Sequence, residues 1–303
     1  MQFKRIKRPI NGVLLLDKPH GFSSNQALQK VKWLYQAEKA GHTGTLDPLA
    51  TGLLPICLGE ATKFAQFVTD ADKTYVATIK LGTTTTTGDA EGEVLVTSPV
   101  NVTSVQLAAV CKQFLGEISQ IPPMYSALKH EGKALYEYAR DGVDIARQAR
   151  SVFIKKIEIN AFSTQVVEIT VACSKGTYIR TLAEDIGKEL GCGAHLIGLR
   201  RTETAGYLLA HAVTIEQLDA MTTEARDAKL LPVDSAIESL PKVILNNDAA
   251  HFLLQGQAIW QAGKVPQSDL RLYDESNQFL GLGFLQDDGK IAPKRLIKNT
   301  PRL

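Results

Sequence analysis

A period-two pattern over residues 74–82 is the feature that most constrains how this chain of 303 residues can fold. Every second position there carries an apolar or aromatic side chain: Tyr75, Ala77, Ile79 and Leu81. Successive side chains of a β-strand point to opposite faces, so this pattern predicts a strand with one face in a core. Strand patterns return at 152–159, 166–173 and 195–201. The chain therefore contains several strands that are far apart in the sequence.

Helical patterns lie between these strands. Ser23 or Ser24 is placed to cap a helix after a first short apolar strand that begins at Gly12. A later helix has four apolar residues on one face and ends at Gly191: Ile179, Leu182, Ile186 and Leu190. Further helices are predicted at 103–115 and near 214–221. Strands and helices together indicate the α/β (α+β) class.

The length of the chain and an expected linker predict one large domain and one small domain. Residues 1–240 form the large domain, with a polar, basic insertion at about 122–150, and Leu240-Pro241 is the expected linker. Short strand candidates with glycines between them predict a small β-barrel at 243–303: 243–246, 258–260, 270–273 and 278–285. Five basic side chains near the C-terminus suit phosphate groups: Lys290, Lys294, Arg295, Lys298 and Arg302.

The composition excludes several classes of protein to which this chain could belong. Hydrophobic residues make up 44% of the chain and charged residues 22%, which excludes wholesale disorder and fibrous proteins. No apolar run reaches the roughly 18–20 residues that a membrane span needs, so no membrane association is expected. The four cysteines form no CxxC pair, which disfavours a disulfide scaffold or a zinc site. We expect a cytoplasmic protein that uses no metal.

The charge of the chain permits a nucleic-acid partner without requiring one. The formal net charge is only +2, but the first 80 residues are basic and residues 201–240 are acidic. A protein that binds a polyanion needs a positive surface rather than a positive total. Solvated lysines explain such a bias equally well.

Asp47 is the first candidate catalytic residue. It precedes Pro48 in the segment 41–52, which is too rich in Gly and Thr to be a helix. A carboxylate on a loop held by rigid neighbours can act as a nucleophile or a base. An aspartate before proline is also a common turn former, and that alternative stays open. His42, in the same segment, could carry a proton, stack on a ring or bind phosphate, or it could be a structural histidine.

A second candidate cluster is Lys175-Gly-Thr-Tyr-Ile-Arg180. Because Ile179 belongs to the buried helical face, Tyr178 and Arg180 point elsewhere, toward the start of the helix. An aromatic ring beside a guanidinium suits a nucleobase and a phosphate. A surface tyrosine and a solvated arginine are the alternative. Tyr75 stands near a strand start, where a half-buried core tyrosine is the usual explanation.

Other catalytic patterns are missing from the sequence. No Ser-His-Asp pattern or glycosidase-like pair of carboxylates can be justified near Asp47. The chain has no GxxxxGK[ST] phosphate loop and no HxE…CxxC zinc-deaminase pattern.

Four segments resemble the bacterial tRNA pseudouridine-55 synthases of the TruB family. They are Gly12-Val-Leu-Leu-Leu-Asp-Lys-Pro-His-Gly-Phe-Ser-Ser, Gly41-His-Thr-Gly-Thr-Leu-Asp-Pro-Leu-Ala-Thr-Gly, Lys175-Gly-Thr-Tyr-Ile-Arg and Leu199-Arg-Arg-Thr. Ile121-Pro-Pro-Met-Tyr-Ser-Ala-Leu-Lys, with the basic insertion, resembles the stand-alone bacterial branch of the family. The resemblance covers essentially the whole chain.

The resemblance implies a pseudouridine synthase core, in which helices flank a mixed, mainly antiparallel sheet, and a C-terminal PUA-like domain. It implies isomerisation of uridine 55 in the tRNA T arm to pseudouridine, with no cofactor. The target base must leave its stack to be reached, and base flipping is the known solution. The partner implied is tRNA, bound by a monomer with no guide RNA and no obligate protein partner. A tRNA-binding folding factor whose catalysis is incidental is the alternative.

The resemblance also assigns roles to individual residues. Asp47 corresponds to the catalytic aspartate, His42 to the residue that occupies the vacated space in the RNA loop, and Tyr75 to the ring that stacks on the flipped uracil.

Three further positions correspond to the binding pocket. Tyr178 and Leu199 correspond to residues that contact the base, and Arg180 to the arginine beside the aspartate. A guanidinium and backbone N–H groups of the Gly/Thr loop would both favour an ionised Asp47. Residues 83–87 are an unbroken run of threonines. Asp89, in the turn after this threonine run, is a second candidate partner for Arg180 or a plain turn residue.

Overall fold

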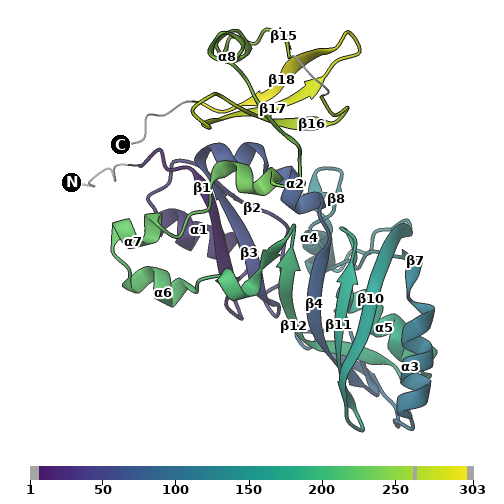
Figure 1. The fold of residues 1–303 in the computed structure, drawn as a ribbon. Helices are drawn as coiled ribbons and strands as arrows, with labels where there is room; N and C mark the ends of the chain where they lie inside the picture. The colour runs from purple at the N-terminus through teal and green to yellow at the C-terminus, as the bar shows by residue number, and fades with distance from the viewer. Residues whose placement is uncertain (1–6, 262–264, 299–303) are drawn as a thin grey trace.

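The computed structural model describes residues 7–261 and 265–298, and within them the main sheet has nine strands (Figure 1). Seven strands run in the order β1-β3-β12-β4-β11-β10-β7, while β2 pairs with β3 and β13 with β12. The β12–β3 pairing is parallel and the others are antiparallel. The strands are β1 (Gly12–Lys18), β2 (Ala40–His42), β3 (Thr51–Leu58), β4 (Lys73–Leu81), β7 (Gly116–Gln120), β10 (Arg150–Phe162), β11 (Val166–Cys173), β12 (Ala194–Thr204) and β13 (Tyr207–Leu208). This is the mixed, mainly antiparallel sheet that the resemblance implies.

Strand β4 lies in the middle of this sheet and confirms the strand predicted over 74–82. Its burial alternates along the whole strand, with Tyr75 and the other apolar positions of the pattern inside. The strand pairs with β11 on one side and with β12 on the other. The period-two pattern therefore marks a central strand.

Helices flank the sheet, as expected. They include α1 (Ser24–Leu34), α3 (Ser104–Gln113), α5 (Ile179–Glu189) and α6 (Ile215–Ala220). Ser23 caps α1 in a capping box with Gln26. Figure 1 shows α3 and α5 beside the β10–β11 part of the sheet, and the buried faces of α1 and α5 share one apolar cluster with the strands. No helix in the described ranges is long and apolar enough to cross a membrane.

Strand β3 is an element that the pattern did not predict. Residues 41–52 have no periodicity, and 53–58 form a continuous apolar run. The structure shows why alternation is missing: both faces of β3 are buried. Leu54 and Ile56 pack in one apolar cluster, and Leu53 and Cys57 in another. A strand covered on both faces has no polar positions to mark its period.

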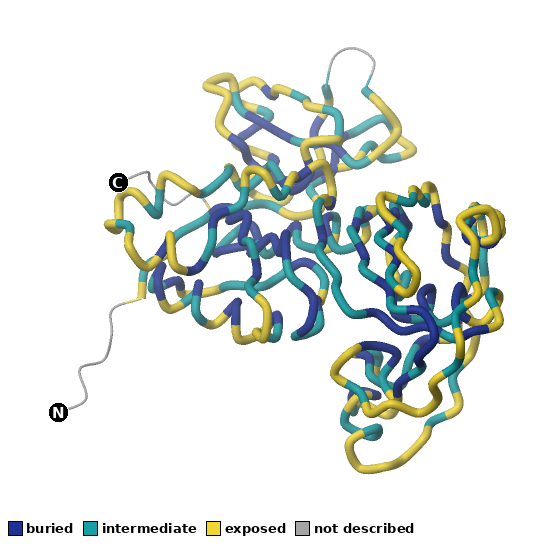
Figure 2. The backbone as a smooth tube through the Cα atoms, turned by 90° about the horizontal axis from the view of Figure 1, so that it is seen from below, coloured by how far each residue is buried: buried dark blue, intermediate teal, exposed yellow. Residues whose placement is uncertain are grey.

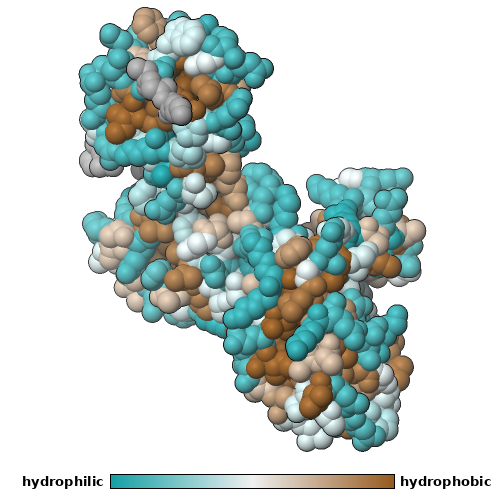
Figure 3. All heavy atoms as spheres, turned by 45° about the vertical axis from the view of Figure 1, so that its right-hand side comes forward, coloured by the Kyte–Doolittle hydropathy of each residue, from teal (hydrophilic) through white to brown (hydrophobic). Residues whose placement is uncertain are grey.

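The C-terminal strands form a separate five-stranded sheet in the order β14-β16-β17-β18-β15. The strands are β14 (Lys242–Ile244), β15 (Ile259–Trp260), β16 (Asp269–Tyr273), β17 (Phe279–Leu285) and β18 (Lys290–Leu296). Its outer strands, β14 and β15, do not pair, so the sheet is a half-barrel of the PUA-like kind. Helix α8 (Asn247–Leu254), which was not predicted, contacts β15 and β18. In Figure 3 this domain projects as a lobe at the top.

An apolar cluster joins the C-terminal domain to the main body. Phe64, from the segment after β3, makes an edge-to-face contact with Phe279 of β17, with the ring centroids 5.6 Å apart. Tyr273 of β16 packs on Phe279, and all three residues belong to the cluster that also covers β3. Figure 2 shows buried segments, in dark blue, in both domains. The small domain therefore completes a core and is more than a tethered module.

The insertion (residues 122–150) lies between β7 and β10. It contains two short strands, β8 (Lys129–His130) and β9 (Lys133–Ala134), and the helix α4 (Leu135–Arg140). Few of its side chains are buried. Its two ends meet, because Gln120 and Arg150 are partners in the β7–β10 pairing.

The shared apolar cluster predicts the effect of Phe279→Ala. The free energy of unfolding should fall by about 3–5 kcal/mol, because a large aromatic side chain is lost from a packed interface. Phe284→Ala, on the same strand but 36% exposed, is the control and should cost about 1 kcal/mol or less. Urea unfolding measures both. Equal losses would show that the domains do not share a stabilising core.

Candidate active site

Five of the six predicted site residues line one pocket of about 300 Å³, a size suited to a small ligand. These residues are Asp47, Tyr75, Tyr178, Arg180 and Leu199. They come from four separate segments: the loop before β3, strand β4, the start of α5 and strand β12. The main sheet brings them together, since β4 and β12 are neighbours and α5 packs on β12.

The loop that carries Asp47 is held by its neighbours. The buried Ser24 hydroxyl, in the first turn of α1, donates to the Leu46 carbonyl at 3.0 Å and accepts from the Leu46 N–H at 2.7 Å. Gly52, where the loop joins β3, has a φ of +98°, and a Cβ there would lie 2.3 Å from the Arg201 carbonyl oxygen. Only glycine fits this close approach. Asp47 thus sits on a constrained loop.

Arg180 is the centre of the pocket's polar contacts. Its side chain is 5% exposed, and its Nη2 lies 3.0 Å from Asp47 Oδ2. The guanidinium also donates to the carbonyls of Thr87 at 3.0 Å and Tyr125 at 2.5 Å, and its Nε lies 3.6 Å from Asp89 Oδ2. The structure therefore places Arg180 beside the aspartate, and it confirms Asp89 as the second partner.

The two carboxylates around Arg180 have different environments. Asp89 is 4% exposed, accepts from the Thr87 hydroxyl at 2.5 Å and from the Glu91 N–H at 3.1 Å, and is fully engaged. Asp47 is 39% exposed, and its carboxylate contacts Arg180 among the described residues. Asp47 is the carboxylate that remains available to a ligand.

Burial raises the pKa of Asp47 above its ordinary value, and the charge of Asp89 adds to the rise. Arg180 acts in the opposite direction, as expected from the sequence. The expected backbone N–H donors are not found on the Asp47 carboxylate in the described part of the chain. Arg180 is thus the main group that favours the ionised form of Asp47, and its effect on the pKa opposes the effect of burial.

The sequence analysis missed Arg201 as a member of this pocket. Arg201 is 1% exposed, and its Nε donates to the Leu53 carbonyl at 2.7 Å. Its guanidinium lies beside the Tyr75 hydroxyl. Nearby, burial together with the charge of Arg201 lowers the pKa of Lys73 to about 8. The motif Leu199-Arg-Arg-Thr contained the residue, but only the fold shows that Arg201 points inward.

His42 does not line this pocket with the other five residues. It is the last residue of β2, and its Nδ1 is buried with no hydrogen-bond partner in the described part of the chain. Burial lowers the pKa of the imidazole, and the charge of Arg201 lowers it further. Both effects favour the neutral form of the His42 ring.

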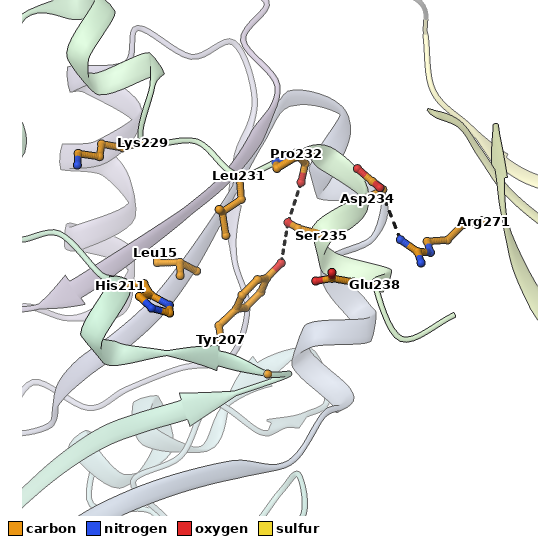
Figure 4. Close-up of a pocket in the computed structure, with 11 residues that line it drawn as sticks. Leu15, Tyr207, His211, Lys229, Leu231, Pro232, Asp234, Ser235, Glu238 and Arg271 are labelled. Atoms are coloured by element: carbon orange, nitrogen blue, oxygen red, sulfur yellow. Dashed lines mark hydrogen bonds and ion pairs between the residues drawn. The ribbon is translucent and has the colours of Figure 1, made fainter. Parts of the chain in front are cut away.

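A second pocket, of about 330 Å³, lies where the two domains meet (Figure 4). The Tyr207 and Ser235 hydroxyls are 2.9 Å apart, and Ser235 donates to the Pro232 carbonyl at 2.7 Å. Arg271, from the C-terminal domain, reaches Asp234 at 3.7 Å. These contacts tie the pocket to the domain junction.

No group of three or more His, Cys, Asp or Glu side chains in the described ranges is placed to hold a metal ion. The charged and aromatic side chains that line the first pocket are one carboxylate, two guanidiniums, one lysine and two tyrosine rings.

The main sheet is mixed, its pocket holds a carboxylate–guanidinium pair, and a half-barrel domain follows. Sequence comparison places this fold and this site in the class of pseudouridylate synthases. The chain matches the family described as "TruB family pseudouridylate synthase (N terminal domain)" over residues 32–179. Two C-terminal TruB domains match residues 180–238 and 241–297. The chain belongs to the TruB family.

Individual relatives agree with this assignment. The chain is 62% identical to a tRNA pseudouridine synthase B of Methylobacillus flagellatus over 300 residues, with 99% of each chain covered. It is 52% identical to the protein of the same name from Stutzerimonas stutzeri, covering 98% and 99%. A solved H/ACA ribonucleoprotein bound to substrate RNA contains a chain of the same fold, with a TM-score of 0.70, 26% identity, and 95% of this chain and 85% of that chain covered.

The difference between the two carboxylates predicts their effects on stability. Asp89→Ala should lower the free energy of unfolding by about 1.5–3 kcal/mol, because buried hydrogen-bonding groups lose a charged partner. Asp47→Ala should cost about 1 kcal/mol or less, since the carboxylate is partly exposed. Chemical denaturation of both variants tests this order. If Asp47→Ala is the more damaging, the division of roles is wrong.

Proposed function

We propose that this enzyme converts uridine 55 in the T arm of tRNA to pseudouridine, with Asp47 as its catalytic carboxylate. The contact of Asp47 with Arg180 inside the pocket is the observation that carries the proposal. Membership of a pseudouridylate synthase family supports the reaction, and the names of the relatives support tRNA as the substrate. The exact uridine comes from the resemblance in sequence.

The reaction needs a group that acts at carbon. Conversion of uridine to pseudouridine breaks the N1–C1′ bond, forms a C5–C1′ bond and moves a proton from C5 to N1. Atoms and electrons balance within the substrate, so no co-substrate is consumed. An ionised Asp47 can attack C1′ of the ribose or C6 of the base, or remove the C5 proton afterwards.

Arg180 has two functions in this scheme. It favours the carboxylate form of Asp47 against the effect of burial, and it orients one oxygen of the carboxylate. The contacts with Asp89 and Thr87 hold the guanidinium in place before substrate arrives. Such preorganisation costs no rearrangement at the moment of reaction.

The remaining pocket residues suit a base that has left its stack. Tyr75 and Tyr178 supply aromatic rings, and Leu199 supplies an apolar surface. A pyrimidine inside an RNA loop cannot reach such a pocket, so the base has to flip out. His42, outside the lining of the pocket, is the candidate to occupy the vacated space in the loop, and its neutral ring suits stacking on bases.

Binding of the T arm relies on basic side chains, but those of the C-terminal domain are less available than the sequence suggested. Lys290 pairs with Asp288, Lys294 pairs with Asp269, and Arg295 donates to the Lys63 carbonyl. Arg302 lies outside the described residues. The pairs of Lys290 and Lys294 are partly exposed, so these side chains can still contact phosphate. That the five basic side chains bind phosphate groups stays a prediction.

We further propose that the enzyme acts as a monomer in the cytoplasm, without a guide RNA or an obligate protein partner. The insertion supports this view, because three of its residues complete the lining of the pocket within the chain itself: Ser126, Ala127 and Leu128. The alternative, a tRNA-binding folding factor with incidental catalysis, predicts a function that survives loss of Asp47.

Asp47→Asn should lower the rate of pseudouridine formation in tRNA by about 10⁴-fold or more, as expected for loss of a nucleophile or base. tRNA affinity should stay close to that of the wild type. His42→Ala is the comparison and should cost less than about 100-fold, because it supports flipping and not bond breaking. Position-resolved detection of pseudouridine measures both. Substantial activity in Asp47→Asn would remove Asp47 from this role.

The pH dependence of the rate gives a second test. If the carboxylate form reacts, the single-turnover rate should fall on the acid side, at a pH above the ordinary carboxyl pKa of about 3.9, because burial raises the pKa of Asp47. Arg180→Gln removes an opposite charge and should move this midpoint to higher pH. Asp89→Asn removes a like charge and should move it to lower pH. Shifts in the same direction would contradict the proposed electrostatics.

A further inference from the structure

Gln120 is a buried polar residue that the scheme above does not use. It is the last residue of β7, at the root of the insertion, and is 2% exposed. Its side chain reaches across to the start of α5, 58 positions later in the chain. It does not line the pocket.

The Gln120 amide binds both backbone groups of Tyr178. Its Oε1 accepts from the Tyr178 N–H at 3.0 Å, and its Nε2 donates to the Tyr178 carbonyl at 3.3 Å. Tyr178 is the N-cap of α5, and its own side chain makes no capping hydrogen bond. The first N–H groups of a helix need partners from elsewhere. Gln120 thus fixes the chain at the point where α5 begins.

This point of the chain carries two residues of the pocket, Tyr178 and Arg180. Two further contacts join the same segment to the root of the insertion. The Tyr125 carbonyl accepts from Arg180, and the Ser126 hydroxyl lies close to the Tyr178 hydroxyl. Of these contacts, only the hydrogen bonds of Gln120 bind the backbone of the segment alone. They therefore set the position from which the Arg180 side chain extends.

We infer that Gln120 is a positioning residue, which holds the start of α5 so that Arg180 meets Asp47 and Tyr178 faces the base. This inference rests on the proposed function. A displacement of catalytic groups by about 1 Å can cost about 100-fold in rate, even when the changed residue is remote from the chemistry. A residue that only stabilised the fold would affect the rate no more than any other equally destabilising change.

Gln120→Met tests the inference, because it keeps the shape of the side chain and removes both hydrogen bonds. The single-turnover rate at saturating tRNA should fall about ten- to hundredfold. The Kd for tRNA should stay within about twofold, since Gln120 does not reach the pocket. Val152→Ala is the matched control: Val152 is buried, pairs with Ile118 of β7 and has no side-chain hydrogen-bonding group that could hold Tyr178. It should lower the melting temperature while the rate stays within about twofold.

Gln120→Glu is the conservative variant. At this buried position the neutral carboxyl group is favoured. One of its oxygens can accept from the Tyr178 N–H, and its O–H can donate to the Tyr178 carbonyl, as the Gln120 amide does. Its rate should exceed that of Gln120→Met by about tenfold. The inference is overturned if Gln120→Met reacts at the wild-type rate, if Val152→Ala is equally slow, or if Gln120→Glu shows no rescue. A wild-type enzyme without activity on tRNA would instead refute the proposed function.

Discussion

The guanidinium of Arg180 is the group on which the candidate active site depends, because it is buried and bound by three segments that are distant in the chain. Asp47 comes from the loop before β3, Asp89 from the turn after the threonine run, and the Tyr125 carbonyl from the insertion. A guanidinium has five N–H donors in one plane, so a single side chain can bind all of these partners. Its position therefore requires the main sheet, the turn and the insertion to be in place together.

The rest of the structure holds this arrangement from outside. Ser24 fixes the loop of Asp47, and Gln120 fixes the backbone from which Arg180 extends. The C-terminal domain contributes to the same body, because Phe279 completes the apolar cluster that covers the far face of β3. A small pocket with one partly exposed carboxylate is thus supported by buried contacts on several sides. Such support is what a reaction at carbon needs, because the reacting groups must be held before the substrate arrives.

Elements with one buried face could be predicted from their period, whereas a strand with two buried faces shows no period. Strand β1, also buried on both faces, was predicted only as a short apolar run. The alternation around Tyr75 marked β4, and the apolar face of Ile179–Leu190 marked α5, because each has a polar side that reveals its period. Strand β3 lacks such a side and was missed. Among the site residues, Asp47 and Arg180 stood out in unusual local segments. Gln120 did not, because its partners are backbone groups, which leave no trace in residue identity.

The amino-acid sequence by itself determined many of the local elements, the candidate carboxylate on its Gly/Thr loop, and the family through its motifs. The tertiary structure alone decided which residues meet: Asp89 with Arg180, Arg201 with the Leu53 carbonyl, and Phe64 with Phe279. It also decided that His42 lies apart from the pocket lining. The physical reason is distance along the chain. Periodicity depends on neighbours a few residues apart. A buried ion pair or a shared core forms only when remote segments come together, which costs conformational entropy.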